Sequence, residues 1–414
     1  MQEKPSRLLW VFFLAYFTFG MITNVLGVVI PEVKAQYQLS YFAAGFLAFG
    51  FFIAYGIFSI PAGLLMDRLG AKPLVLLGVI LMALGCLVIA WAQTYPLMLA
   101  MIFAVGVGVT ILQTAGNPLI QHLDRPENYH RNLTLTIGFC GIGAFLGPFL
   151  LAFVRGMGHG WQALYVLFTV LCVVLMVPVI FSRFPATATG DKFRADRLGR
   201  ILNNPLILLY TLGVFFYVGA EVGTASWIVS FFDRVHGLAP QPARVASAGF
   251  FNRLMPTLPA LVVALFWGLQ GIGRLVSGAV LNTFGSRRIL RLYSFMTVAS
   301  LLAAIFGSQT MTAVGFAACG FFTSVLITLI ISGTINTFAE NHGTISGLLC
   351  TAIMVGALLP PMAGLVGDHY GMRAAMMVPL VSFVYVFLLA LFGRARYEES
   401  NGEDAKAAAT DTGR

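Results

Sequence analysis

Glu221 is the residue of this sequence whose type and position are best suited to chemistry. The chain has 414 residues and 16 acidic side chains, and all of these except Glu221 lie in loops, tails or the ends of apolar runs. A carboxylate deep in an apolar run is costly unless it is protonated, paired or facing a water-filled cavity. We therefore predict that Glu221 exchanges a proton. A permanently protonated carboxyl that bonds a neighbouring helix is the alternative.

Neutral polar side chains within the apolar runs are candidates for binding a solute. The candidates are Asn24, Gln113, Asn117, Thr224 and Trp227. Such groups commonly satisfy their own helix backbone or a neighbouring helix in membranes, which is the alternative for each of them. Asn117 precedes a proline, which frees backbone groups that can line a cavity. Trp227 could stack on an apolar face of the solute or anchor the chain at the membrane interface.

A charged segment follows the second apolar run and is repeated later in the chain. Asp67, Arg68 and Lys72 lie in the pattern Gly-x3-Asp-x2-Gly-x-Lys, which starts at residue 63. The pattern returns at residue 278, an offset of 215 residues, with Asn282 in place of the acid and Arg287 in place of the lysine. We predict that these charges form a network at one gate, which must break for that gate to open. The alternative is a solvated turn that only anchors the topology.

Two further features bear on gating. Arg274 is a basic residue well inside an apolar run, and we predict that it snorkels toward the membrane surface or packs at the gate. A related Gly-x3-Asp-x2-Gly pattern, from Gly364 to Gly371, follows the eleventh run on the opposite side of the predicted membrane. This second pattern is either a gate element or only a turn.

The elements that must position these residues are membrane-spanning helices. Hydrophobic residues make up 58% of the chain and charged residues 10%, and the mean hydropathy is +0.87. Soluble proteins carry roughly a quarter charged residues, so the composition predicts an all-α integral membrane protein. Apolar runs of on the order of 20 residues without alternation favour helices over a closed barrel. Twelve spans are predicted, at 8–30, 41–66, 73–92, 97–121, 133–155, 161–184, 204–232, 257–283, 289–308, 311–338, 343–367 and 373–393.

The repeat and a long polar segment divide the twelve transmembrane helices into two pseudo-symmetric six-helix bundles. The predicted segments are residues 1–184 for the N-terminal bundle, 185–203 for a cytoplasmic linker, 204–393 for the C-terminal bundle and 394–414 for a disordered cytoplasmic tail. Lysine and arginine are enriched on the side that holds the N-terminus, which places both termini in the cytoplasm. Parallel halves indicate a transporter with its site near the midplane, between the bundles.

Several other classes of protein fit the sequence poorly. The net charge of +9 comes from basic residues scattered between apolar runs, not from a face that could bind nucleic acid. The five cysteines and six histidines lack the spacing of metal ligands, so no metal or other cofactor is expected. One isolated carboxylate supplies no nucleophile–base pair, which argues against an intramembrane enzyme. A sensor would need a soluble signalling domain, which the loops do not provide. The expected partners are a small-molecule solute, a proton or sodium, and the lipids of the cell inner membrane, with the protein acting as a monomer.

Three segments resemble known transporters. The segment GLLMDRLGAK, residues 63–72, resembles the hallmark loop of the major facilitator superfamily, and the order of spans is similar over nearly the whole chain. The segments LQTAGNP, residues 112–118, and YVGAEVGTASW, residues 217–227, resemble helices of the fucose/galactose/glucose:proton symporter family, especially its glucose branch. The resemblance implies the major facilitator fold and proton-coupled transport by alternating access. It also implies substrate or coupling roles for Asn24, Gln113, Asn117 and Glu221.

The sequence departs from that family at positions expected to contact sugar. Gly27 stands where the family has an aspartate, and Leu135, Gly138 and Leu326 stand where it has amides expected to face sugar hydroxyls. Recognition of hydroxyl groups is lost steeply without buried polar partners. These departures favour a less hydroxylated or more apolar solute. A proton-coupled exporter of an apolar metabolite or drug is therefore the alternative to a sugar transporter.

Overall fold

The computed structural model describes residues 7–123, 129–184, 204–238, 256–337 and 342–393. All regular secondary structure within these ranges is helical, as expected for apolar segments that must satisfy their backbone hydrogen bonds internally in a membrane. The predicted linker and tail, residues 185–203 and 394–414, lie outside the described ranges.

The helices follow the predicted spans closely. Those of the first half are α1 (Arg7–Asn24), α2 (Leu26–Gln36), α3 (Tyr41–Leu69), α4 (Ala71–Trp91), α5 (Tyr95–His122), α6 (Tyr129–Gly156) and α7 (Gln162–Phe181). Those of the second half are α9 (Pro205–His236), α11 (Leu258–Phe284), α12 (Ser286–Phe306), α13 (Gln309–Thr323), α14 (Leu326–Thr337), α15 (His342–Gly356), α16 (Leu359–Tyr370), α17 (Met372–Ala375) and α18 (Met377–Phe392).

Within the described residues, the predicted set of twelve spans is confirmed. Eleven helical segments are long and apolar enough to cross a membrane, and the pair α1 and α2, bent by 41°, makes twelve if it counts as one span. Two spans of the second half are interrupted near the middle, one between α13 and α14 and the other between α15 and α16. Such breaks free backbone carbonyl groups, which membrane proteins tolerate where other groups bond them or where they line a cavity.

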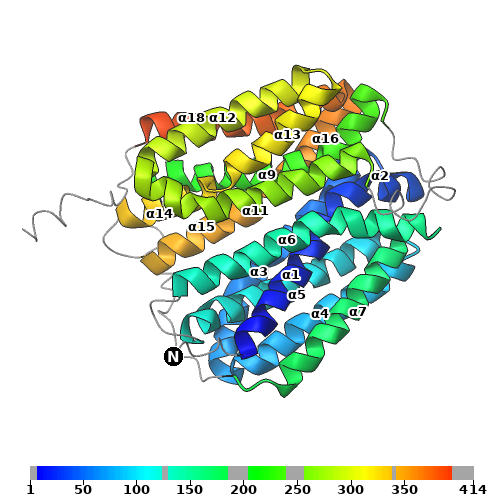
Figure 1. Cartoon of the computed structure of the whole chain (residues 1–414), viewed down its shortest axis with the longest axis vertical. Coiled ribbons are helices and arrows are strands. Elements are labelled where there is room, and N and C mark those ends of the chain that lie inside the picture. The colour runs from blue at the N-terminus through cyan, green and yellow to red at the C-terminus, as the bar shows by residue number, and fades with distance from the viewer. Residues whose placement is uncertain (1–6, 124–128, 185–203, 239–255, 338–341, 394–414) are drawn as a thin grey trace, which may run out of the picture.

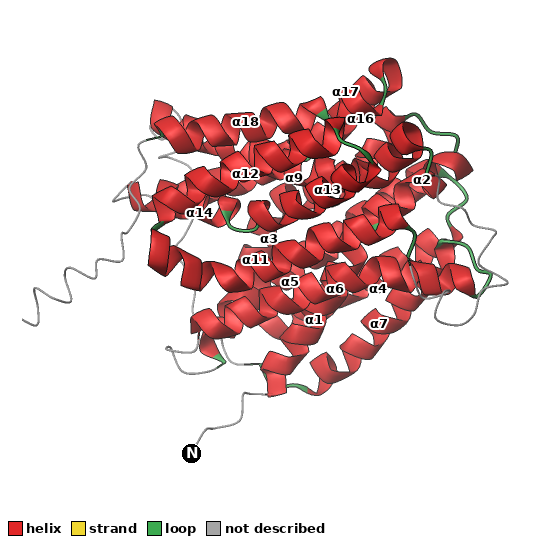
Figure 2. Ribbon diagram, turned by 45° about the horizontal axis from the view of Figure 1, so that its top comes forward, coloured by secondary structure: helices red, strands yellow, loops and turns green. Residues whose placement is uncertain are grey.

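The helices pack in two groups that follow the order of the chain (Figure 1). In the first group, α1 packs against α6, α3 against α5, and α4 against both α5 and α7. In the second, α11 and α12 pack against α13, and α9 packs against α15 and α18. We call the groups the N-bundle (residues 7–184) and the C-bundle (residues 204–393). They meet where α3 packs on α15 and α16, α6 on α11, and α2 on α9, and Figure 2 shows the long helices lying side by side.

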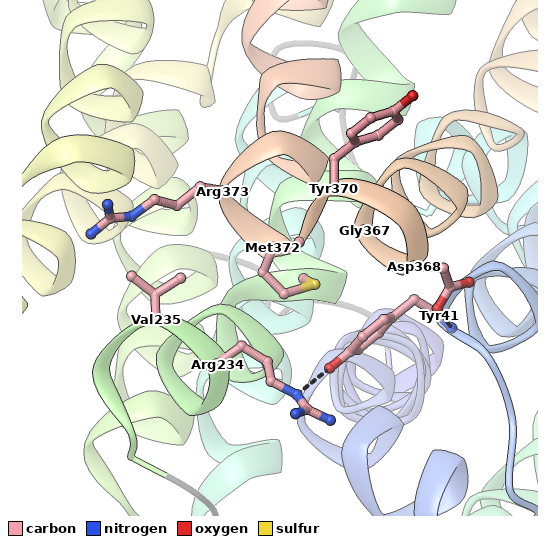
Figure 3. A pocket seen from close by; sticks show the side chains of 9 residues that line it. Tyr41, Arg234, Val235, Gly367, Asp368, Tyr370, Met372 and Arg373 are labelled. Atoms are coloured by element: carbon pink, nitrogen blue, oxygen red, sulfur yellow. Dashed lines mark hydrogen bonds between the residues drawn. The ribbon is translucent and has the colours of Figure 1, made fainter.

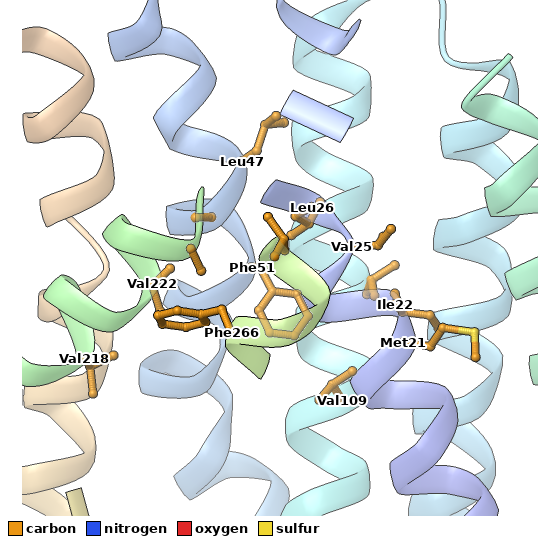
Figure 4. Packing of buried hydrophobic residues seen from close by; sticks show 14 of the residues in the cluster. Met21, Ile22, Val25, Leu26, Leu47, Phe51, Val109, Val218, Val222 and Phe266 are labelled. Carbon is orange, nitrogen blue, oxygen red and sulfur yellow. The ribbon is translucent and has the colours of Figure 1, made fainter. Parts of the chain in front are cut away.

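Close helix packing in both bundles depends on apolar side chains and a few glycines. Figure 4 shows buried residues of α1, α3, α9 and α11, including Phe51, Val222 and Phe266, gathered near the middle of the molecule. A Cβ atom added at Gly143 would lie 2.0 Å from the backbone oxygen of Phe17, so α1 and α6 approach as closely as they do because residue 143 has no side chain. The absence of a side chain at residue 143 therefore allows these two helices of the N-bundle to pack closely.

The two ends of the helices can be told apart by their contacts. We call them the Tyr41 end, where α3 begins, and the Lys72 end, where α3 finishes. At the Lys72 end, Lys72 Nζ donates hydrogen bonds to the backbone oxygens of Ile180, at 2.6 Å, and Ser182, at 3.0 Å, where α7 finishes. Arg287 Nη2 donates to the backbone oxygen of Gly393, at 3.3 Å, where α18 finishes. A cation at a helix C-terminus is favourable. Lys72 and Arg287, which occupy equivalent positions in the sequence repeat, therefore make equivalent contacts in the two bundles.

Candidate functional site

A cavity of about 140 Å³ lies between the bundles, near the middle of the spans. It is lined by residues of α1, α3 and α6 from the N-bundle and of α9 and α11 from the C-bundle. The polar side chains that line it are Thr23, Asn24, Tyr55, Glu221, Gln270 and Arg274. The remaining lining is apolar or small, so a few polar groups converge on an otherwise apolar cavity, which is typical of small-molecule sites.

Glu221 lies at the centre of a hydrogen-bonded cluster on the C-bundle side of this cavity. Its Oε1 atom accepts a hydrogen bond from the hydroxyl of Tyr217, at 2.6 Å, and another from the side-chain amide of Gln270. Arg274 Nη2 lies 4.0 Å from the same oxygen. The side chain of Glu221 is only 12% exposed. The predicted cost of a carboxylate in this span is therefore offset by two donors and one cation.

The cluster arises from spacing on two helices. Tyr217 and Glu221 are four residues apart on α9, and Gln270 and Arg274 are four residues apart on α11, so each pair occupies one face of its helix. These faces meet because α9 packs against α11. Tyr217 and Gln270 are not among the site residues predicted from the sequence, although their spacing of four positions from Glu221 and Arg274 within apolar runs is a signal that identifies both.

The broken span formed by α13 and α14 contributes backbone oxygens to the cluster. Tyr217 Oη lies 2.8 Å from the backbone oxygen of Thr323, the last residue of α13. Arg274 Nε donates to the backbone oxygen of the next residue, Ser324, at 3.2 Å. The carbonyls freed by the break are therefore bonded by side chains of α9 and α11.

The hydroxyl of Tyr217 has two acceptors but a single hydrogen. It donates to ionised Glu221 or to the backbone oxygen of Thr323, but not to both at once. When Glu221 carries a proton, the carboxyl can donate to the Tyr217 oxygen while the hydroxyl donates to Thr323. Tyr217 and Glu221 can thus remain hydrogen-bonded in either protonation state of the carboxyl, with a change in the direction of donation, and the hydroxyl donates to Thr323 when Glu221 is protonated.

Asn24 is a polar residue on the N-bundle side of the cavity, opposite the Glu221 cluster. It lines the cavity and also a smaller one of about 30 Å³, which Gly27 and Ser226 line as well. Asn24 Nδ2 donates to the backbone oxygen of Gly20, at 2.9 Å, in its own helix. A Cβ atom at Gly27 would lie 2.5 Å from the backbone oxygen of Ala225. The close approach of α2 to α9 thus leaves no room at residue 27 for the aspartate that the related family carries.

Four other predicted solute contacts lie outside the lining of the cavity. Asn117 is exposed and accepts a hydrogen bond of 2.5 Å from Tyr16, while Gln113, one turn earlier on α5, is half-buried. Thr224 is fully buried, and its hydroxyl has no hydrogen-bond partner among the described residues. Trp227 is also fully buried and donates to the backbone oxygen of Pro360, at 3.1 Å. Their roles in binding a solute stay predictions.

The apolar departures from the family pattern also lie away from the polar lining. Gly138 lines a separate apolar groove of about 390 Å³ between α6 and α11, whereas Leu135 is exposed and Leu326 is fully buried at the start of α14. The groove and the cavity share Gly141 and Gly271, where α6 and α11 approach each other closely. The cavity is thus separated from the groove by a contact between two glycines.

Contacts between the bundles join them at the Tyr41 end, where Tyr41, Arg234 and Asp368 also line a surface pocket of about 660 Å³ (Figure 3). Asp368, in the second glycine-rich pattern, accepts hydrogen bonds from the backbone N–H groups of Tyr41, at 2.7 Å, and Phe42, at 2.8 Å. These are the first residues of α3, where unpaired N–H groups and the helix dipole favour an anion. Arg234 Nε also donates to the Tyr41 hydroxyl, at 2.8 Å, and a Cβ atom at Gly364 would lie 2.3 Å from the Tyr41 backbone oxygen. The second pattern is therefore more than a turn.

The contacts of α3 with the C-bundle can be followed from the Tyr41 end toward the Lys72 end. Gly45 and Gly56 of α3 lie against Pro361 and Met354 of the C-bundle. The same face of α3 continues at Ile60 and Leu64, whose side chains are 44% and 61% exposed. The contacts of these two glycines with the C-bundle therefore lie on the part of α3 between its start and residue 56.

The residues predicted to form the gate network lie in different places. Arg68 is exposed at the Lys72 end, while Lys72 and Arg287 bond helix ends within their own bundles. The side chains of Asp67 and Asn282 lie outside the described part of the structure. Arg274, predicted to snorkel or to pack at the gate, lies beside Glu221 in the cavity. The network across the gate stays a prediction.

Two bundles of membrane-spanning helices, closed together at one end around a polar cavity, define a membrane transporter of the two-bundle class. The chain belongs to the major facilitator superfamily, since the model described as "Major Facilitator Superfamily" matches residues 12–255 and 252–412. The predicted fold class and its resemblance to this superfamily are confirmed.

Characterised relatives extend over nearly the whole chain. The chain is 28% identical to the glucose/galactose transporter of Brucella abortus biovar 1 (strain 9-941), over 92% of each protein. It is 23% identical to the L-fucose-proton symporter of Escherichia coli (strain K12), over 91% of each protein. The resemblance to the fucose/galactose/glucose:proton symporter family is confirmed by these relatives.

Solved structures share the fold. A crystal structure of the E. coli fucose:proton symporter matches with a TM-score of 0.62 at 20% identity, over 94% of this chain and 98% of that one. A bacterial homologue of the human lysosomal transporter Spinster, in an inward-facing and occupied conformation, matches with a TM-score of 0.74 at 17% identity, over 94% of this chain and 96% of that one. At these identities the likeness concerns the fold.

Proposed function

We propose that this protein is a secondary transporter that moves a sugar-like solute together with a proton across the cell inner membrane. The observation that carries the proposal is the Glu221 cluster, because its single carboxyl group lies at the cavity and can stay hydrogen-bonded to Tyr217 in both protonation states. The names of the relatives, a glucose/galactose transporter and an L-fucose-proton symporter, support a sugar as solute over an apolar metabolite or drug.

A proton suits this cluster better than sodium does. Hard cations bind where several oxygen ligands converge, whereas the neighbours of Glu221 that face its Oε1 atom are a hydroxyl that donates, an amide N–H and a guanidinium. A sodium ion at that oxygen would face the hydrogens of these donors. Protonation of the carboxyl needs only a change in the direction of the Tyr217 hydrogen bond.

Alternating access follows from the interface between the bundles. The Tyr41 end is held by Asp368 and Arg234, and we propose that the interface opens toward the Lys72 end, where Ile60 and Leu64 of α3 are exposed. The positive-inside rule assigns the Lys72 end, and both chain termini, to the cytoplasm. In this orientation the cavity is closed to the outside, and the contacts at the Tyr41 end must break for the solute to enter from there.

The solute is held between the two bundles in this proposal. Asn24 and Thr23 face it from the N-bundle, and Gln270 faces it from the C-bundle, because all three line the cavity. Gln113 and Asn117 on α5 are proposed as contacts along the path toward the Lys72 end. Thr224 and Trp227 lie beyond the cavity toward the Tyr41 end, so we propose that they contact the solute only in a state in which that end opens.

The proposal is tested with purified protein in liposomes. We expect Glu221→Gln to abolish uptake driven by a pH gradient while sugar exchange without a gradient persists, because the amide oxygen still accepts hydrogen bonds but the amide does not take up or release a proton near neutral pH. The matched control is Glu32→Gln, because Glu32 forms an ion pair with Arg155 within the N-bundle, away from the cavity. This variant should keep pH-driven uptake. Full pH-driven accumulation by Glu221→Gln would remove this carboxyl from the mechanism.

A further inference from the structure

The net charge of the cavity depends on whether Glu221 is protonated. Among the described residues that line it, Glu221 and Arg274 are the charged side chains, and Arg274 Nη2 lies 4.0 Å from Glu221 Oε1. An arginine stays protonated at any pH at which a protein works. The cavity is therefore neutral when Glu221 is ionised and carries one positive charge when Glu221 takes up a proton.

No other described group facing the pair supplies a negative charge near pH 7. The titratable groups that interact with Glu221 or Arg274, or share the cavity, are Tyr217 on α9, Cys319 on α13, Tyr55 on α3 and Cys140 on α6. These are phenols and thiols, which are neutral at that pH in their ordinary range. Protonation of Glu221 thus leaves the Arg274 guanidinium without a counter-ion among these residues.

The guanidinium is placed to accept a replacement anion. Its Nε donates to the backbone oxygen of Ser324, and the side chain keeps 34% of its surface exposed. An unpaired cation in a low-dielectric cavity is costly, whereas a carboxylate on a guanidinium forms strong, paired hydrogen bonds. A solute with a carboxylate group would therefore bind best when Glu221 is protonated and would be repelled when Glu221 is ionised.

We propose that the solute is an acidic monosaccharide, a sugar whose carboxylate pairs with Arg274 while Glu221 holds the co-transported proton. This inference rests on the proposed function and narrows its solute class. The small number of amide side chains around the cavity is consistent with such a solute, because one charged contact with Arg274 would anchor it. Asn24, Thr23 and Gln270 would then bind its hydroxyl groups. The departures at Gly27, Leu135, Gly138 and Leu326 then need not disfavour a sugar.

Coupling follows directly from this charge exchange. The proton and the anion favour each other, because the proton frees Arg274 and the anion neutralises it. Loss of the proton restores the pair between Glu221 and Arg274, which disfavours the anion. Loss of the anion leaves Arg274 without a counter-ion, which favours release of the proton. One proton and one monoanion move together without net charge, whereas a neutral sugar with one proton would carry one positive charge per cycle.

The test compares two sugars that differ only at one carbon. Labelled D-glucuronate and D-glucose are offered to the full-length protein in liposomes under an inward pH gradient, with the membrane potential set by potassium and valinomycin. We expect glucuronate uptake at least about tenfold above glucose uptake, with little response to potential. Arg274→Gln should reduce glucuronate uptake about 10- to 100-fold, and Arg274→Lys should restore part of it. Arg288→Gln, at an exposed position of α12, is the matched control.

The outcomes separate the inference from the proposed function. Uptake of glucose equal to or above that of glucuronate, with the same preference in Arg274→Gln, would overturn the acidic solute and leave a proton-coupled sugar transporter. Uptake of neither sugar would remove the proposed function, and the inference with it. If Arg274→Gln does not fold, the preference and voltage response of the wild type, together with Arg274→Lys, still decide the question.

Discussion

Substitution of Asp368 is expected to loosen the closed end of the interface. Asp368 of α16 accepts hydrogen bonds from the backbone N–H groups of Tyr41 and Phe42, the first residues of α3. Asp368→Asn keeps the shape of the side chain but removes its charge, and the amide offers one oxygen where the carboxylate offers two. One N–H group of α3 must then turn to water or remain unpaired.

The size of the effect can be worked out from these contacts. An anion at an exposed helix N-terminus stabilises by about 0.3–1 kcal/mol, and a lost hydrogen bond costs about 1 kcal/mol when the freed group stays buried. Asp368 is exposed, so water takes over part of the lost contact. We therefore expect the closed state to lose about 1 kcal/mol relative to the open one, which is about a fivefold shift in their ratio.

Distances between spin labels would measure this shift. Labels on cysteines introduced at Gln93 in the N-bundle and Met311 in the C-bundle, both exposed near the Tyr41 end, report the separation of the bundles there. Asp368→Asn should move the distance distribution toward longer values, whereas Asp233→Asn, which also removes an acid near this end, should not. Identical distributions for the wild type and Asp368→Asn would refute the idea that this carboxylate holds the end closed.

Two further substitutions test the packing and hydrogen bonding around the cavity. Tyr217→Phe removes the donor to Glu221 and to the backbone oxygen of Thr323, and should lower the free energy of unfolding by about 1–3 kcal/mol, measured by denaturant titration of the purified protein; an unchanged value would mean that water replaces the hydroxyl. Gly27→Ala places a Cβ atom 2.5 Å from the backbone oxygen of Ala225 and should cost about 1–3 kcal/mol in the same titration. Gly223→Ala, whose Cβ atom would meet nothing closer than 4.0 Å, is its control, and equal effects of the two changes would contradict the close approach of α2 to α9.

The spans were predictable because their signal is local. A membrane helix must be apolar over a fixed length, and this requirement can be read from each run of the sequence without knowing its neighbours. The breaks within the spans were not predictable in this way. Ser324 and Val325, which form the break between α13 and α14, are neither proline nor glycine, and the carbonyls of Thr323 and Ser324 are bonded by side chains of two other helices, α9 and α11. That break depends on tertiary contacts.

The same distinction between local signals and tertiary contacts applies to the residues of the candidate site. Glu221 could be recognised because one acid in an apolar run is rare and costly, whereas Tyr217 and Gln270 are ordinary residues in such runs until the contact between α9 and α11 is known. Arg274 was noticed, but its position along α11 gave no sign that it faces an acid on another helix. Isolated charges are therefore visible in the sequence, and the partners that make them functional are a property of helix packing.

Helix α9 joins the cavity to the closed end of the interface. It carries Tyr217 and Glu221 at the cavity and Trp227 and Arg234 toward the Tyr41 end, within one continuous helix of 32 residues. Thirteen residues separate Glu221 from Arg234, which corresponds to about 20 Å along the helix. Because α9 is continuous, we expect a movement that separates Glu221 from Gln270 and Arg274 to displace Arg234 from Tyr41 as well. The proposed proton site and the contacts between the bundles at the Tyr41 end are therefore connected by one helix, and we expect a change at either to affect the other.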